Sequence, residues 1–149
     1  LGVDRIDVVL IHDVDVWTHG DRMEQRFAEA MDGAYRALEE LRASGAVKAI
    51  GVGVNEAEMC VRFARAGDFD VIFNTVPTLL FDRAVLAGLN RNTLLIDLAS
   101  RPGGVDFNTA AEMQIKTIWA LSLPGRVAPK SAGAIIKNTI LNMIKEGVQ

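Results

Sequence analysis

Two histidines and two aspartates lie close together near the start of the sequence. His12 and Asp13 follow an apolar run, and Asp15 and His19 come soon after them. Imidazole and carboxylate groups are common metal ligands, so this segment could in principle hold a metal ion. Its spacing matches no standard metal motif, however, and a solvated loop explains the same residues more simply. We therefore predict no metal site in this segment.

A pair of glycines, Gly51 and Gly53, follows the second apolar run and resembles the start of a dinucleotide-binding turn. Such a turn requires a third glycine, and Glu56 stands in its position. A carboxylate in the first turn of a helix suits the helix dipole, but it repels a pyrophosphate that would use the same N–H groups. We therefore predict that this turn does not bind a phosphate.

Other polar residues and glycines gather where predicted strands end, which is where an open α/β sheet binds its ligands. Arg101 and Lys130 could hold an anion, and Asp97 ends an apolar run. Loop ends are polar and glycine-rich in most proteins, so a small-molecule cleft and ordinary loops both explain these residues. The sequence contains no Gly-x-Ser-x-Gly nucleophile motif. Cys60 lies in a predicted helix, where a small core residue is the simplest interpretation.

Apolar runs of strand length alternate along the chain with segments of helical periodicity. The predicted strands are residues 6–12, 49–54, 71–73, 94–98 and 117–120. The predicted helices are residues 21–45, 55–67, 82–89, 107–114 and 129–147, with loops at 13–20 and 121–128. Asp21 with Glu24, and Asn55 with Glu58, form capping-box-like pairs at the first two helix starts.

Five successive strand–helix units imply parallel strands joined by right-handed crossovers. Five strands are too few for an eight-stranded barrel, and near-continuous apolar runs suit strands covered on both faces. We therefore predict a three-layer open parallel sheet with helices on both faces, flavodoxin-like or Rossmann-like, with the strand order 2-1-3-4-5. Since no linker or low-complexity segment interrupts the pattern, residues 1–149 are predicted to form one domain.

Composition narrows the classes of function. The chain has 149 residues, half of them apolar, and a net charge of -3, which gives no basic surface for nucleic acid. No apolar run approaches the ~20 residues that span a bilayer, so no membrane partner is predicted. The single cysteine cannot form an internal disulfide, which fits a reducing, cytoplasmic location. The chain starts at Leu1 without a methionine, so we expect a fragment of a longer sequence.

Three segments of the first half resemble the aldo-keto reductases, especially the branch of aldose and pyridoxal dehydrogenases. They are residues 1–12 (LGVDRIDVVLIH), 34–45 (AYRALEELRASG) and 47–55 (VKAIGVGVN), and the likeness reaches about Phe73. The resemblance implies a TIM-barrel origin, NADP or NAD as cofactor, and a catalytic Asp, Tyr, Lys and His. It places His12 on the family's histidine, and Gly53 to Asn55 in the turn that contacts the nicotinamide amide.

The same resemblance indicates which parts of the family's site have no counterpart. In aldo-keto reductases the Asp, Tyr and Lys come from earlier strands and the cofactor-phosphate loops from later ones, and no matching segments are found here. Tyr35 lies in the middle of a predicted helix, and Lys48 enters the second strand at the wrong end, so neither replaces the missing groups. We therefore expect His12 to be a vestigial catalytic residue.

The second half, from about Asp70 to Gln149, resembles the C-terminal part of the NAD(P)-binding domain in the A subunit of dipicolinate synthase. The matching segments are residues 70–77 (DVIFNTVP), 95–104 (LIDLASRPGG) and 123–133 (LPGRVAPKSAG). The resemblance implies a Rossmann fold, although that family's glycine-rich turn has no counterpart here. With the two residues from the first half, the predicted cofactor-binding set is Gly53, Asn55, Asn74, Thr75, Pro77, Ser100, Arg101, Gly103, Gly104 and Lys130.

Likeness to two unrelated enzyme families, meeting near Phe73, predicts an engineered chimera of residues 1–73 and 74–149. Both families are built of right-handed βα units, so their parts are sterically compatible. Cavities or loosened packing are expected where the parts make new contacts. Incomplete catalytic sets predict a folded protein without efficient catalysis and without a required cofactor.

Two alternatives stay open at this point. The chain could be an NAD(P)-dependent oxidoreductase or a weak nucleotide binder, in which His12 acts with the loops at Asn74 and Ser100–Arg101. It could also be an interaction module, in which the apolar surface left by missing barrel strands drives homodimerisation.

Overall fold

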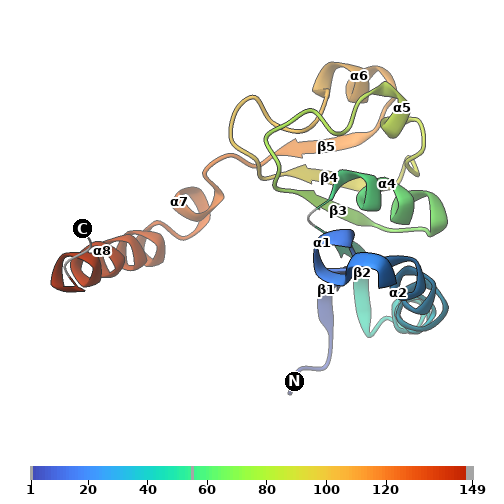
Figure 1. The fold of residues 1–149 in the computed structure, drawn as a ribbon, viewed down its shortest axis with the longest axis horizontal. Coiled ribbons are helices and arrows are strands. Elements are labelled where there is room, and N and C mark those ends of the chain that lie inside the picture. Colours follow the sequence, from blue (N-terminus) through green and yellow to red (C-terminus); the bar gives the residue numbers. More distant parts are fainter. Residues whose placement is uncertain (1, 55, 147–149) are drawn as a thin grey trace.

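A computed structural model describes residues 2–54 and 56–146, and it contains one five-stranded parallel sheet (Figure 1). The strands are β1 (Ile6–His12), β2 (Val47–Gly53), β3 (Val71–Asn74), β4 (Leu94–Asp97) and β5 (Lys116–Trp119). Their order across the sheet is the order of the chain, β1-β2-β3-β4-β5. All five strand positions predicted from the apolar runs are confirmed to within two residues at each end.

The predicted class, a parallel α/β sheet of Rossmann-like type, is confirmed, but the predicted strand order 2-1-3-4-5 is wrong. When right-handed crossovers place every new strand on the same side of the last one, every crossover helix falls on the same face. The core residues follow this rule. Ile11, Val52, Ile72 and Leu95 are aligned across the sheet, and they pack with the helices in two buried clusters. The helices of these clusters therefore cover one face, not the two faces expected.

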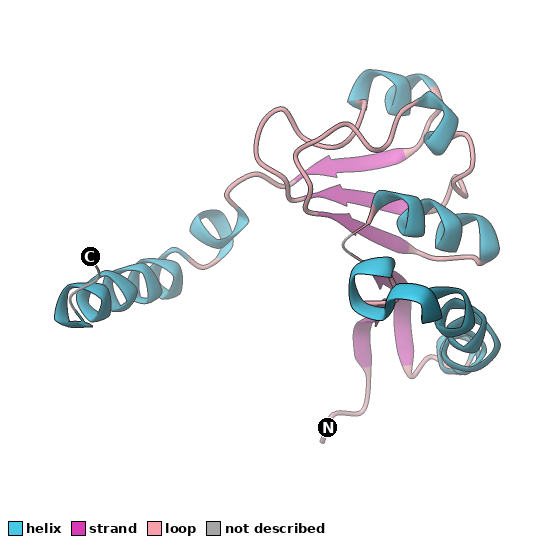
Figure 2. Ribbon diagram, viewed as in Figure 1, coloured by secondary structure: helices cyan, strands magenta, loops and turns pink. Residues whose placement is uncertain are grey.

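The first crossover is almost entirely helical (Figure 2). It contains α1 (Val16–His19), a 3₁₀ turn η1 (Gly20–Arg22), α2 (Met23–Glu29), a π-helical segment η2 (Ala30–Tyr35) and α3 (Arg36–Ala43). The helix predicted for residues 21–45 corresponds to η1 through α3, but α1 falls in the predicted loop 13–20. Asp15 stabilises α1, since its side chain accepts a hydrogen bond from the Thr18 N–H at 2.9 Å.

The later crossovers are shorter. They contain α4 (Ala57–Ala66), α5 (Arg83–Leu86) and α6 (Phe107–Glu112), followed after β5 by α7 (Leu123–Val127) and α8 (Pro129–Glu146). α7 lies in a segment predicted as a loop, and the predicted cap Asn55 lies outside the described residues. α8 extends away from the sheet (Figure 1). Within residues 2–54 and 56–146, no helix combines the length and apolarity needed to cross a bilayer.

Helix α4 joins the two buried clusters. Its residues Met59 and Phe63 belong to the cluster formed with β1, β2 and the first crossover. Cys60 and Ala64 belong to the cluster formed with β3, β4, α5 and α6. Successive residues of one helix therefore contribute to the interiors of both halves of the sheet, which couples the two halves mechanically.

Candidate functional site

Asp97, the last residue of β4, organises the loops at the carboxyl ends of β3 and β4. Its side chain is completely buried and accepts three hydrogen bonds. The donors are Asn74 Nδ2 at 2.8 Å, the Ala99 N–H at 3.0 Å and the Gly104 N–H at 2.8 Å. Because a buried carboxylate is tolerated only when such donors surround it, Asp97 holds the loop 98–104 in one conformation.

Asn74 completes this arrangement from the end of β3. Its Nδ2 donates to the Val76 carbonyl at 3.0 Å as well as to Asp97, and its Oδ1 accepts from the Val76 N–H at 3.2 Å. Both ends of the amide are therefore used within the protein. The sequence predicted a cofactor-binding role for Asn74, but its contacts are those of a residue that positions two loops.

Gly103 and Gly104 allow the loop to approach these side chains closely. Gly103 has φ +88°, a conformation that favours glycine. A Cβ atom on Gly104 would lie 2.2 Å from Asn74 Nδ2 and 2.6 Å from the Val76 carbonyl oxygen. The two glycines predicted to face a cofactor are thus required by packing inside the loop.

Replacing Gly104 with alanine is expected to lower the free energy of unfolding by about 2–3 kcal/mol, because the loop must move away from Asn74 and Val76. Urea titration followed by circular dichroism measures the change. Gly125→Ala is the matched control: no heavy atom lies within 4 Å of its added Cβ, so a change under about 1 kcal/mol is expected. Equal effects of the two substitutions would contradict this account of the loop.

An aromatic and cationic rim lies beside the loop. The Trp119 ring stacks on Phe107 with ring centroids 5.2 Å apart, and its Nε1 donates to the Ala99 carbonyl at 3.1 Å. The guanidinium of Arg101 lies 5.3 Å from the centroid of the Trp119 ring, and Arg101 itself is exposed. Sequence reasoning named Arg101 but missed Trp119, although a tryptophan ending a strand at the ligand-binding edge is a usable signal.

His12 lies apart from this rim and points to the other face of the sheet. It is paired with Gly53, in the alternation that includes Phe73, whereas Asn74 and Asp97 belong to the helix-covered face. Two strands separate β1 from β4, which corresponds to about 14 Å at the usual strand spacing. The side chain of His12 is 63% exposed, and its Nδ1 lies 2.9 Å from an Asp13 carboxylate oxygen.

The remaining predicted residues are dispersed. Gly53 is covered by the His12 ring, whose Cδ2 would lie 2.7 Å from an added Cβ. Thr75 and Pro77 are exposed beyond the end of β3, and Lys130 is exposed in α8. Asn55 lies outside the described residues. Of the predicted set, the structure brings together Asn74, Ser100, Arg101, Gly103 and Gly104, which lie on the ends of β3 and β4.

The predicted phosphate turn after β2 has its carboxylate engaged within the protein. Glu56 precedes α4, and its two carboxylate oxygens accept from the Val16 N–H at 3.1 Å and the Trp17 N–H at 2.9 Å. These are the N–H groups at the start of α1. Glu56 therefore ties the first crossover to the edge of the sheet and places a negative charge at this turn.

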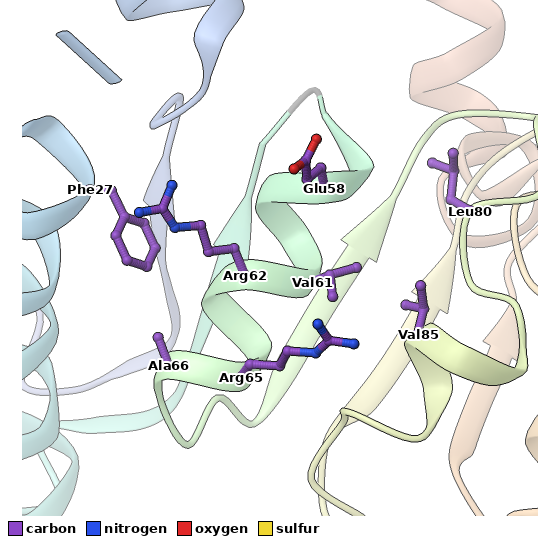
Figure 3. A pocket seen from close by; sticks show the side chains of 8 residues that line it. All are labelled: Phe27, Glu58, Val61, Arg62, Arg65, Ala66, Leu80 and Val85. Atoms are coloured by element: carbon purple, nitrogen blue, oxygen red, sulfur yellow. The ribbon is translucent and has the colours of Figure 1, made fainter. Parts of the chain in front are cut away.

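Pockets flank the sheet at two places that bear on the predicted site. One of about 420 Å³ is lined by Leu98, Ala120, Ser122 and Leu123, beside the ends of β4 and β5. A larger pocket of about 710 Å³ lies on the outer side of α4, and none of its lining residues belongs to the predicted binding set (Figure 3). It extends from Phe27 of α2 to Val85 of α5, so it lies where the two clusters meet and where we expected imperfect packing.

The charged groups of the larger pocket are partly engaged with one another. Arg62 Nη1 donates to Glu24 at 2.6 Å, and this hydrogen bond holds the pKa of Glu24 below its ordinary value. The Arg62 guanidinium also lies 4.0 Å from the centroid of the Phe27 ring. On the inner side of α4, burial raises the pKa of the Cys60 thiol to about 12, as befits the small core residue that was predicted. Its thiol is therefore uncharged at neutral pH.

Among the residues that the structure describes, no three histidine, cysteine, aspartate or glutamate side chains converge on a point suitable for a metal ion. The nearby pair His12 and Asp13 instead forms the contact described above.

Comparison with known proteins divides the chain into two parts. The model of the aldo/keto reductase family matches residues 1–94. Pyridoxal 4-dehydrogenase of Microbacterium luteolum is 41% identical over 71 residues, 47% of this chain and 21% of the relative. The A subunit of dipicolinate synthase from Bacillus subtilis is 44% identical over 79 residues, 53% of this chain and 27% of the relative. The two resemblances expected from the sequence are thereby confirmed.

Solved structures give the same answer for the fold. The crystal structure of the dipicolinate synthase A chain from Bacillus subtilis matches 97% of this chain and 47% of its own, with a TM-score of 0.55 and 28% identity. The corresponding protein from Bacillus halodurans matches 95% of this chain and 47% of its own, with a TM-score of 0.53 and 28% identity. The chain thus spans about a quarter of the curated relatives and about half of the solved neighbours.

Proposed function

The chain belongs to the aldo/keto reductase family through residues 1–94, and on that premise we propose that it is an engineered recombination with a part of the dipicolinate synthase A chain, folding as one domain without efficient catalysis. In this proposal each part supplies strands, helices and a share of the hydrophobic interior. Neither part supplies a working set of groups for hydride transfer to a carbonyl compound.

The observation that supports the proposal is the separation of the candidate groups. His12 lies on β1 and points to the uncovered face, while Asn74 and Asp97 end β3 and β4 on the helix-covered face. A reductase must hold its cofactor, proton donor and substrate carbonyl within a few ångströms of one another. Asn74 and Asp97 also use their hydrogen bonds on each other and on loop N–H groups, so neither is poised for a substrate.

An assay of the reductase reaction tests the proposal. Purified protein is incubated with NAD or NADP and either pyridoxal or an aldose, and the reduced nicotinamide is followed by its absorbance. We expect no rate above that of buffer. A turnover number near the ~10 s⁻¹ typical of enzymes, lowered strongly by His12→Ala, would contradict the proposal.

Weak NAD(P) binding is a second candidate, and the rim of Arg101 and Trp119 favours it. The relatives are named as dehydrogenases, and Arg101 offers an exposed cation beside a flat aromatic surface. An exposed guanidinium suits a phosphate group, and an aromatic ring suits a planar base. Without a glycine-rich turn that presents N–H groups to the pyrophosphate, the affinity is expected to be in the millimolar range, about -4 kcal/mol.

Fluorescence titration with NADPH tests this candidate. Arg101→Ala is expected to weaken binding at least several-fold, because it removes the phosphate contact. Lys130→Ala is the matched control: its cation is equally exposed but lies on α8, so we expect no change. Equal effects of the two substitutions, or no binding to the original protein, would remove the second candidate and leave the first unchanged.

A further inference from the structure

One face of the sheet carries apolar side chains that the described helices do not cover. By strand alternation this open face includes Val8 of β1, Phe73 of β3, Ile96 of β4 and Ile118 of β5. Val8 is 43% exposed and Ile118 is 49% exposed, while Phe73 and Ile96 are half-buried by their neighbours in the sheet. Parallel sheets are stable when both faces are covered, so this surface calls for a partner.

Helix α8 carries the complementary surface. Ile136, Ile140, Met143 and Ile144 recur at helical spacing and form one stripe, and each is between 48% and 71% exposed. α8 packs against α7, and Figure 1 shows it extending away from the sheet. An amphipathic helix whose apolar stripe faces water is unusual in a folded protein, because most helical stability comes from packing that stripe.

We propose that two copies of this chain form a dimer in which the α8 stripe of each copy lies on the open face of the other copy's sheet. The exchange is reciprocal, so it closes with two-fold symmetry and leaves neither surface exposed. It also keeps the connection between β5 and α8 as the structure has it, directed away from its own sheet. Returning α8 to its own sheet would instead require a reversal of the chain near α7.

The dimensions agree with a specific interface. The 18 residues of α8 make a helix about 27 Å long and about 10 Å wide, similar in length to the width of a five-stranded sheet with its flanking side chains. Two such contacts, each covering a helix surface and a sheet surface, bury on the order of 1,100 Å². This clears the ~1,000 Å² expected of a biological interface, and the surfaces buried are mostly aliphatic.

Light scattering during size-exclusion chromatography tests the proposal. The expected mass at about 100 µM is twice the 16.2 kDa of one chain. Ile140→Glu places a charge in the α8 stripe, and Ile118→Glu places one on the open face; each should shift the protein to monomer and weaken association at least 100-fold. Both residues are half-exposed in the single chain, so circular dichroism should show the fold retained.

Ile135→Glu is the matched control. Ile135 has the same side chain on the same helix and is 66% exposed, but it lies outside the stripe. It should leave the dimer intact. A monomer at every concentration would overturn the proposal, and hydrogen exchange protecting α8 in that monomer would show that the helix covers its own sheet. A dimer that survives both Ile140→Glu and Ile118→Glu would also overturn it.

Discussion

Replacing Asp97 with alanine is expected to lower the free energy of unfolding by about 3–5 kcal/mol, the largest effect of any single polar substitution in the described chain. The substitution leaves Asn74 Nδ2 and the N–H groups of Ala99 and Gly104 without their acceptor in a buried setting. Each unsatisfied donor costs about 1–3 kcal/mol, although partial entry of water reduces the sum. Urea denaturation at neutral pH measures the loss.

Asp106→Ala is the control for Asp97→Ala. Asp106 also accepts backbone hydrogen bonds, from the Thr109 N–H at 3.0 Å at the start of α6, but it is only half-buried. Its loss should cost about 1 kcal/mol, as for an ordinary helix cap. If Asp97→Ala cost no more than Asp106→Ala, Asp97 would be a residue available for ligand chemistry rather than the support of the loop.

Replacing Phe63 with alanine is expected to cost about 3–5 kcal/mol, because it opens a cavity in the first cluster. The Phe63 ring is completely buried, with its centroid 4.7 Å from that of Phe27 and 5.9 Å from that of Phe69. Since α4 also forms a wall of the second cluster, the substitution should destabilise both halves together. Thermal unfolding followed by circular dichroism should show one transition at a lower temperature.

Trp17→Ala is the control for Phe63→Ala. Trp17 has an even larger aromatic side chain, but it is 85% exposed on α1. Its loss should change the free energy of unfolding by less than about 0.5 kcal/mol. Two separate transitions in the Phe63→Ala protein, with only the first half affected, would contradict the role given to α4.

The sequence predicted the elements well because apolar runs and helix caps are local signals. The run from Ile6 to His12 became β1 without change, and the stripe containing Phe27 and Met31 became the buried side of the first crossover. The strand order could not be predicted in this way. A right-handed crossover can add its strand to either edge of the growing sheet, and nothing in the pattern of one sequence states which edge is used.

The candidate site was predicted less completely than the fold. Resemblance named the right loops, and Asn74, Ser100, Arg101, Gly103 and Gly104 do lie together. It could not show that Asp97 occupies the hydrogen-bonding groups of Asn74, since that depends on a contact between residues 23 positions apart. It also could not show that His12 points to the other face, because the face of a strand residue is fixed only by its register.

Hydrogen exchange at increasing urea concentrations tests most directly whether segments from two enzyme families form one cooperative unit. We compare buried residues of β2, such as Ile50 and Val52, with Leu95 of β4. The account predicts that the two strands converge on the same opening free energy as urea approaches the unfolding midpoint. Opening free energies that stay apart by more than about 2 kcal/mol up to the midpoint would show two independently folding parts and contradict it.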